Sequence, residues 1–481
     1  QPQQATFPHP VLTDNADDRS IRRGRFQSLQ WGTYDLPECD GHYQIEYRVA
    51  MGDPNVLEQM RAEWNDRARE DANYYVAFGR RQQNDDEFFA TASDLVRELE
   101  AELRRLPPRP EGWTALEIGC GPGRLMRPMS RHFREIHGVD VSDEMVRLAN
   151  EKLQGIAHAH AHATPDSSLS MFPDESFDFV YSYAVFQHIP SRDVVLGYLA
   201  EAGRVLRPGG ILRCQINGLP EQAVRYTTWS GVRISATEVA KFALHHDFQL
   251  LALDGILTQY MWTTWRKRPA GWRASVRLPE HPATQVRNIS NAYSGEPLVP
   301  AAGRLAAASL WLEQLPEDCD LLNLAVTFDG APGRLSYLGP PAWDGVQQLN
   351  AALPRGIRTG LVPVELRWLG QPLAAARWLR VIPAGPVVPR VCSVSDGVNL
   401  LAGRHIESGT VKATLEELDH PEWFQATVDG LPVREIDFFC TDPLTQRFEI
   451  NFHLPFGLAA GEHRLEMSLG KRTFAPVPIQ V

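Results

Sequence analysis

The sequence predicts an α/β domain with a parallel sheet, followed by two all-β domains. Between Trp113 and Arg266, short apolar runs alternate with helical segments, an order typical of a doubly wound parallel sheet with helices on both faces. After Arg266, short β-like runs recur about every 8–12 residues between turn residues, which is typical of β-sandwiches. We expect an N-terminal extension at 1–55, the α/β domain at 56–268, and β-sandwich domains at 269–385 and 386–481.

The elements of the α/β domain follow from their periodicity. Asn55–Leu106 is expected to be helical because apolar residues recur at steps of three and four. Pro208-Gly209-Gly210 predicts a turn. Strands are expected at Trp113–Ile118, Ile136–Val141, Ile156–Thr164, Phe177–Tyr183, Ile211–Ile216, Phe248–Asp254 and Gln259–Arg266, and helices at Asp143–Leu153 and Val194–Leu206.

The C-terminal part contains an internal repeat with a period near 100 residues. Asp329-Gly330 recurs as Asp429-Gly430, and Leu353-Pro354 recurs as Leu454-Pro455. An ordered series of such matches indicates two copies of one supersecondary unit. The proline-rich stretch 383–389 is expected to join the two copies as a stiff linker.

Composition narrows the classes of function. The formal net charge of −11 argues against nucleic acid as the partner, because phosphate backbones favour clustered Lys and Arg. No apolar run approaches the roughly 18–20 residues that span a bilayer, so no membrane partner is expected. The six scattered cysteines are typical of free thiols, which favours the cytoplasm.

A glycine loop between the first strand and the next helix is the most informative motif. Glycines at such a bend allow a tight turn and a close approach of ligand to backbone, and the helix N-terminus presents unpaired N–H groups. The dinucleotide fingerprint G-x-G-x-x-G is met at Gly119 and Gly121, but Arg124 replaces its third glycine. A nicotinamide cofactor is therefore disfavoured.

Glu117-x-Gly119-x-Gly121-x-Gly123 resembles the first motif of the class I S-adenosylmethionine (SAM)-dependent methyltransferases, which have a Rossmann-like fold. Asp140, at the end of the second strand, is similar to the acidic residue that binds the ribose hydroxyls in that family. The segments 172–178 and 206–210 resemble the family's approaches to its fourth and fifth strands. The resemblance covers 55–268 and implies SAM as cofactor, with S-adenosylhomocysteine as its product.

The resemblance also implies the cofactor residues. Glu117 would anchor the loop near the methionine amino group, and Met145 would cover the adenine. Family members carry Asp-Ala after the third strand, whereas this sequence has His162-Ala163 there, with Asp166 close by. The full expected set is Glu117, Gly119, Cys120, Gly121, Gly123, Asp140, Val141, Met145, His162, Ala163 and Ser182.

Candidate acceptor-side residues follow from the rule that ligands bind outside the carboxyl ends of parallel strands. His188, just past the fourth strand, is a candidate general base; the alternative is that it orders its loop through a backbone hydrogen bond. Trp64 is expected in the core. The other candidates are Tyr183 as a second catalytic residue, and Tyr74, Tyr75, Gln187, Gln215 and Asn217 as substrate-binding residues.

The sequence argues against a metal site and against a DNA-methyltransferase site. His158, His160 and His162 alternate with alanines and would share one face of a strand, but three imidazoles in a row rarely converge on one ion. No metal is therefore expected. Gln187-His188-Ile189-Pro190 also differs from the motifs of DNA methyltransferases.

The sequence thus predicts a SAM-dependent methyltransferase acting on a small molecule or glycan. The β-sandwiches, which resemble the immunoglobulin-like repeats of bacterial surface proteins, are expected to position a large acceptor or form a homodimer. The alternative is a catalytically passive SAM-binding protein whose sandwiches bind a glycan or a protein.

Overall fold

The structure is a computed structural model that describes residues 54–77, 81–164, 166–221, 225–442 and 445–481. The N-terminal extension expected at 1–55 therefore lies outside the described residues, except for its last two positions. Among the described residues, no helix combines the length and the apolar composition needed to cross a bilayer. The five described cysteines form no disulfide.

The N-terminal domain contains seven strands in the order β3-β2-β1-β4-β5-β7-β6. The first five are parallel to their neighbours, and β7 is antiparallel to both β5 and β6. All seven predicted strands are present. Their bounds are β1 Thr114–Ile118, β2 Glu135–Asp140, β3 Ala159–Ala163, β4 Phe177–Ser182, β5 Leu206–Ile216, β6 Phe248–Asp254 and β7 Met261–Lys267.

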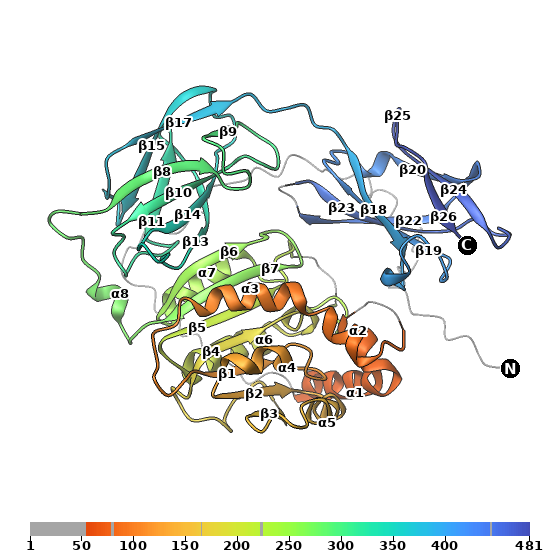
Figure 1. Cartoon of the computed structure of the whole chain (residues 1–481), viewed down its shortest axis with the longest axis horizontal. Coiled ribbons are helices and arrows are strands. Elements are labelled where there is room, and N and C mark those ends of the chain that lie inside the picture. Colours follow the sequence, from red (N-terminus) through yellow and green to blue (C-terminus); the bar gives the residue numbers. More distant parts are fainter. Residues whose placement is uncertain (1–53, 78–80, 165, 222–224, 443–444) are drawn as a thin grey trace. The chain divides into compact units, whose positions relative to one another are not determined.

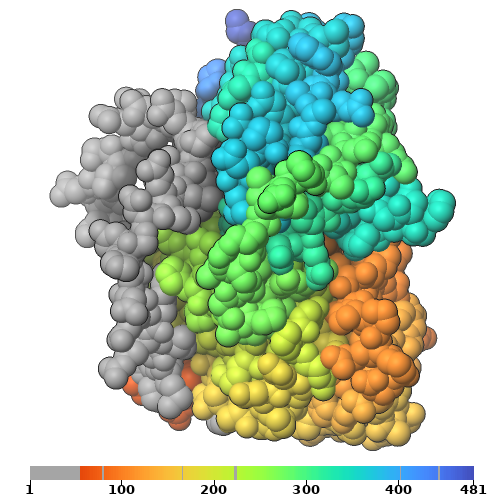
Figure 2. All heavy atoms as spheres, turned by 90° about the vertical axis from the view of Figure 1, so that its left-hand side faces the viewer, coloured from red at the N-terminus to blue at the C-terminus, as the bar shows by residue number. Residues whose placement is uncertain are grey.

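Helices cover both faces of this sheet, as Figure 1 shows with α3 and α4 in front and α6 and α7 behind. In Figure 2 the orange helical segment near residue 100 lies beside the yellow segments that follow it in the chain. The bounds are α1 Pro54–Ala77, α2 Asp85–Ala90, α3 Ser93–Leu103, α4 Met126–Met129, η2 Ser130–His132, α5 Asp143–Lys152, η3 Phe186–His188, α6 Arg192–Val205, α7 Ala236–His245 and α8 Trp272–Ser275.

The sequence predicts a turn at Pro208-Gly209-Gly210 before the fifth strand. This placement is wrong, because the three residues lie inside β5. Leu206 pairs with Phe177 and Ile211 pairs with Phe179, so the three residues form a bulge between two paired stretches. Gly209 takes a φ of 86°, which glycine adopts without strain. Strand pairing continues on both sides of the bulge, which local turn chemistry does not reveal.

The sheet continues beyond β6 into strands of the C-terminal half. Tyr337 of β13 (Arg334–Leu338) pairs with Ala252 of β6, and the sheet runs on through β14 (Gln347–Ala352), β10 (Ala307–Glu313) and β8 (Gln285–Asn291). The seven strands expected from the sequence are therefore part of a sheet of 11 strands, not a sheet of their own. Pairing gives partners to backbone groups that an edge strand would leave exposed.

The rest of the C-terminal half forms three further sheets. One contains β9 Leu298–Pro300, β11 Leu324–Phe328, β12 Ala331–Pro332, β15 Gly360–Trp368, β16 Gln371–Pro372 and β17 Arg377–Ile382. A second contains β18 Arg390–Asp396, β19 Thr410–Glu416, β22 Arg434–Asp442 and β23 Arg447–His453. The third contains β20 Phe424–Val428, β21 Leu431–Pro432, β24 Glu462–Leu469, β25 Arg472–Thr473 and β26 Val477–Gln480, and short turns lie at η4 Leu400–Ala402 and η5 Pro421–Trp423.

The sequence repeat has a structural counterpart. Thr327 pairs with Pro332 and with Glu365, and Thr427 pairs with Pro432 and with Glu466 in the same pattern. The Asp-Gly turns take nearly identical left-handed conformations, with φ of 52° and 80° at 329–330 and 49° and 80° at 429–430. Two-residue turns of this kind favour Asp-Gly because both positions need positive φ.

Gly138 provides a test of how β2 packs against the segment that follows β1. A Cβ there would lie 2.4 Å from Sδ of Met126 and 2.7 Å from Cβ of Cys120, both buried. Gly138→Ala should lower the free energy of unfolding by ~1–3 kcal/mol through overpacking. Denaturant unfolding of the full chain, followed by the helical circular dichroism signal, measures it. Gly385→Ala, where a Cβ meets open space, is the control; equal midpoints for the two variants would contradict the packing.

Candidate functional site

The glycine loop begins where β1 ends and lies against its two neighbouring strands. The N–H groups of Gly119 and Cys120 both donate to the carbonyl oxygen of Val139 in β2, at 2.8 and 3.0 Å. Gly119 has a φ of 73°, and a Cβ on it would lie 2.2 Å from Cγ2 of Val185, just beyond β4. Only glycine therefore fits at this position.

Asp140 lies at the end of β2 and faces this loop. Its carboxylate accepts hydrogen bonds from the N–H groups of Gly121 and Ser142, both at 2.9 Å. Burial raises the pKa of Asp140, while these two backbone donors oppose that shift. The side chain remains partly accessible, so the structure holds a fixed hydrogen-bond acceptor at the carboxyl end of the sheet.

Glu117 is the buried acidic residue of the motif. The hydroxyl of Tyr181 donates to its Oε2 at 2.9 Å. Burial raises the pKa of Glu117 to about 8, although the Tyr181 hydrogen bond and the nearby Arg124 lower it. In the ligand-free protein this carboxyl group is therefore largely protonated at neutral pH.

Helix α1 covers the loops that follow β1 and β2. Oδ1 of Asn65 lies 2.7 Å from Oγ of Ser142 and accepts from N–H of Glu144 at 3.1 Å. Met145 is buried and packs against Ala68 and Ala72 of α1. A Cβ on Gly121 would meet Val76, also on α1, at 3.3 Å. Helix α1 therefore contacts both loops directly. Val141, which follows β2, is buried.

The two cofactor candidates at the end of β3, His162 and Ala163, have different surroundings. Ala163 pairs with Asp140, which places it beside the ribose-binding candidate. The ring of His162 instead lies against His137 of β2, with 3.0 Å between Nε2 and Nδ1. Asp166 lies beyond the strand end, where Tyr198 donates to its backbone carbonyl at 3.3 Å. The adenine-side role of His162 stays a prediction.

The strands next to the loop hold the remaining cofactor-side candidates. Ser182 is buried and its hydroxyl donates to the carbonyl of Ile118 at 2.9 Å, which ties β4 to β1. The ring of Tyr183 stacks on Trp262 with 5.7 Å between centroids, and the guanidinium of Arg124 lies 5.2 Å from the Tyr183 ring. Tyr183 and the buried Gln215 do not line the pocket described next.

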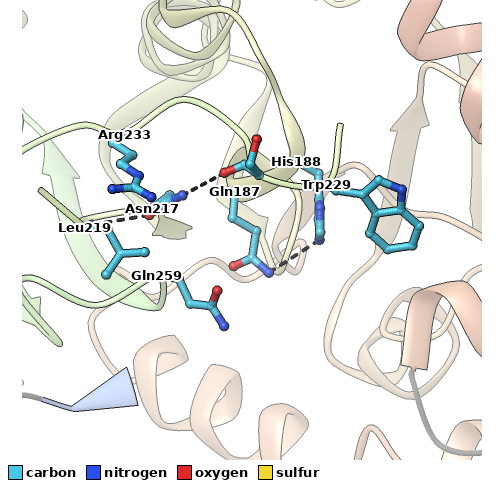
Figure 3. A pocket seen from close by; sticks show the side chains of 8 residues that line it. Gln187, His188, Asn217, Leu219, Trp229, Arg233 and Gln259 are labelled. Carbon is cyan, nitrogen blue, oxygen red and sulfur yellow. Dashed lines mark hydrogen bonds between the residues drawn. The ribbon is translucent and has the colours of Figure 1, made fainter. Parts of the chain in front are cut away.

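A pocket of about 180 Å³ is lined by residues that follow β4 and β5. Figure 3 shows the side chains that line it. It brings together Gln187, His188 and Asn217, which the sequence predicts, and adds residues that it does not. The complete lining is Gln187, His188, Asn217, Leu219, Trp229, Ser230, Arg233 and Gln259.

His188 points one nitrogen at the protein and the other toward this pocket. Its Nδ1 lies 2.9 Å from the carbonyl oxygen of Thr228, which can only accept, so Nδ1 carries the proton and Nε2 is the acceptor. Gln187 Nε2 lies 3.5 Å from that Nε2. Burial lowers the pKa of His188 to about 4, so the ring is neutral at physiological pH. The hydrogen bond to Thr228 supports the alternative that His188 orders its loop. The lone pair on Nε2 is what a general base requires.

A cluster that the sequence did not predict connects α1 with the loop after β5. The guanidinium of Arg67 lies between two rings, 4.6 Å from Trp64 and 4.4 Å from Trp229, and donates to Oγ1 of Thr228 at 2.8 Å. Glu63 pairs with Arg67 at 3.4 Å. Trp64, expected in the core, is partly buried against the small cluster of Ala68, Ala72 and Met145, and it also contacts His188 edge-on at 5.7 Å.

Tyr74 and Tyr75 lie on the last turn of α1. Their rings are 5.3 Å apart, and Tyr75 lies 6.0 Å from Trp229, which borders the pocket. The hydroxyl of Tyr75 donates to Glu70 at 2.7 Å. Neither tyrosine lines the pocket itself. Within the described ranges, no group of three or more His, Cys, Asp or Glu side chains is arranged to hold a metal ion.

One segment of the chain is similar to a known family. Residues 116–214 match a family described as a methyltransferase domain. Phosphoethanolamine N-methyltransferase 2 of Caenorhabditis elegans is 30% identical over 135 residues, which cover 27% of this chain and 30% of that protein. The ubiquinone biosynthesis O-methyltransferase of Paramagnetospirillum magneticum is 33% identical over 103 residues, covering 21% and 39%. The 2-methyl-6-phytyl-1,4-hydroquinone methyltransferase of Synechocystis is 32% identical over 127 residues, covering 26% and 38%.

Among solved structures, phosphoethanolamine N-methyltransferase 1 of Haemonchus contortus aligns with 45% of this chain and 50% of its own, at 15% identity and a TM-score of 0.35. The chain spans only 30–39% of the length of the three relatives named above. The matched region contains the glycine loop, Asp140 and β4, which carry the motifs found in the sequence. The prediction of a SAM-dependent methyltransferase domain is therefore confirmed for the segment 116–214.

Proposed function

We propose that this protein transfers a methyl group from SAM to a small-molecule acceptor. The observation that carries the proposal is the glycine loop, which is fixed to β2 by two backbone hydrogen bonds and faces the carboxylate of Asp140. The three relatives are, by name, methyltransferases for phosphoethanolamine, a phytylhydroquinone and a ubiquinone precursor pathway, and this favours a small-molecule acceptor here.

The residues present fit this cofactor. Cβ atoms on Gly119 and Gly121 would meet Val185 at 2.2 Å and Val76 at 3.3 Å, so the two glycines let the loop pack closely between the segment after β4 and helix α1. Asp140 offers acceptor oxygens for a pair of hydroxyls, and Glu117 offers a carboxyl group for an ammonium. When bound, SAM supplies a methyl group on a sulfonium, which needs alignment with its nucleophile more than it needs activation.

The other cofactor-side residues take supporting roles in the proposal. Gly123 takes a φ of 83°, which glycine adopts without strain, and a Cβ there would make only an ordinary contact of 3.7 Å with Ala149 of α5. Cys120, Val141, Met145, Ala163 and Ser182 complete the wall around the cofactor. The acceptor would enter the pocket bordered by Gln187, His188 and Asn217, with Nε2 of His188 accepting a hydrogen bond from its nucleophile.

The domain boundaries are part of the proposal. We place the catalytic unit at 56–268 and the two β domains at 269–385 and 386–481. The absence of helix or strand between Ile382 and Arg390 supports the second boundary.

Asp140→Asn tests the proposed function. The amide cannot accept hydrogen bonds at both of its terminal atoms, and a hydrogen bond to a charged group contributes about 1.5–3 kcal/mol. Transfer of a tritiated methyl group from SAM into a small-molecule extract should therefore fall at least about tenfold, with a raised KM for SAM. Asp143→Asn, at an exposed position on the first turn of α5, should transfer at the normal rate.

Two outcomes would contradict this account. Equal transfer by the wild type and Asp140→Asn would remove Asp140 from the cofactor site. S-adenosylhomocysteine binding without any transfer to the extract would favour the passive SAM-binding alternative instead.

The raised pKa of Glu117 predicts a pH dependence of binding. Because that pKa is about 8 in the ligand-free protein, an ammonium beside Glu117 requires loss of a proton when binding occurs near neutral pH. The affinity for S-adenosylhomocysteine should rise as the pH increases from 6 toward 8, and proton release should be measurable by calorimetry in buffers of different ionisation enthalpy. Glu117→Gln should abolish the release. Identical affinities of the wild type at pH 6 and pH 7.5 would contradict the contact.

A further inference from the structure

The pocket of Figure 3 has an unusual charge balance. Of its eight lining residues, Arg233 is the only one with a permanent charge, and no carboxylate lines it. His188 is neutral at physiological pH because burial lowers its pKa to about 4. The pocket therefore has a net positive charge that comes from a single guanidinium.

Arg233 has no carboxylate partner within the part of the chain that the structure describes. Its Nη1 donates to the carbonyl of Pro220 at 2.5 Å, which holds the side chain in place, and its Nε is buried without a hydrogen-bond partner. Arg192, which donates to the backbone carbonyl of Arg233, differs because its guanidinium pairs with Glu221 and Glu238. A guanidinium offers five donors in a fixed fork that matches a carboxylate or a phosphate.

The side chain of Asn217, beside Arg233, is held by two hydrogen bonds. Asn217 is buried, donates to the carbonyl of Ser230 at 3.0 Å and accepts from the N–H of Leu219 at 3.2 Å. Figure 3 shows both bonds and places Arg233 on the Asn217 side of the pocket, across from His188. The positive group and the imidazole acceptor thus border the same pocket from opposite sides.

We propose that this pocket binds a methyl acceptor that carries an anionic group, a carboxylate or a phosphate, which Arg233 holds while Nε2 of His188 accepts a hydrogen bond from a hydroxyl or amine of the same molecule. This inference rests on the proposed function. The volume of about 180 Å³ lies below the roughly 300–1,000 Å³ of drug-sized sites, so the acceptor is small or enters by one end.

The test uses three small probes on the full chain: acetate, methyl phosphate and neutral acetamide. Saturation-transfer NMR should detect binding of acetate or methyl phosphate to the wild type. The probe that binds more tightly identifies whether the pocket prefers a carboxylate or a phosphate. Arg233→Gln should weaken that binding at least fivefold, and Arg233→Lys should restore part of it. Arg225→Gln, which removes an exposed arginine from the same loop, is the matched control and should bind as the wild type does.

The outcomes separate this inference from the proposed function. The dissociation constant for S-adenosylhomocysteine should be the same for the wild type and Arg233→Gln, which also shows that the variant is folded. Three outcomes would overturn the inference while leaving cofactor binding intact. They are binding of acetamide as strong as that of acetate, anion binding by Arg233→Gln as strong as that of the wild type, and no anion binding by the wild type. Failure of the wild type to bind S-adenosylhomocysteine would instead overturn the proposed function.

Discussion

The attachment of the glycine loop to the end of β2 is the constraint on which the site depends. Two N–H groups of the loop share the carbonyl of Val139, and a third reaches the carboxylate of Asp140. These bonds satisfy backbone donors that the strand-to-helix bend would otherwise leave unpaired in a buried place. They also fix the carboxylate of Asp140, which we propose receives the ribose hydroxyls, relative to the backbone of the glycine loop.

The second organising interaction is the cluster around Arg67. It packs a buried guanidinium between Trp64 and Trp229 and joins it to Thr228, so α1 is held against the loop that borders the acceptor pocket. Burial lowers the pKa of Arg67, and Glu63 opposes this effect. In the same loop, the carbonyl oxygen of Thr228 accepts a hydrogen bond from Nδ1–H of His188. Helix α1 and the orientation of His188 are thus coupled through Thr228.

Much of the fold, and the glycine-loop side of the candidate site, could be predicted from the sequence. Buried strands and amphipathic helices have local periodicities, and the spacing of Glu117, the three glycines and Asp140 is a local signal. The repeat was visible because Asp-Gly turns need positive φ at fixed positions. The turn at Pro208-Gly209-Gly210 was misplaced because only the pairing with β4 shows that the strand continues around it.

The acceptor side could not be predicted in the same way. Arg67 and Thr228 are 161 positions apart, and neither lies in a recognisable motif. Trp64 fits an amphipathic helix equally well as a core residue or as a neighbour of His188. The importance of Arg233 depends on the absence of a carboxylate around it in the described structure, which no residue pattern encodes. Conversely, Tyr183 follows β4 and Gln215 lies within β5, but neither lines the pocket, since Tyr183 stacks on Trp262 and Gln215 is buried in the sheet.

The most direct test of the central claim is calorimetric titration of the full chain with S-adenosylhomocysteine. The arrangement of the glycine loop and Asp140 predicts saturable binding at one site per chain. A flat titration up to millimolar ligand, with the protein folded by circular dichroism, would contradict the assignment of this loop as a SAM site.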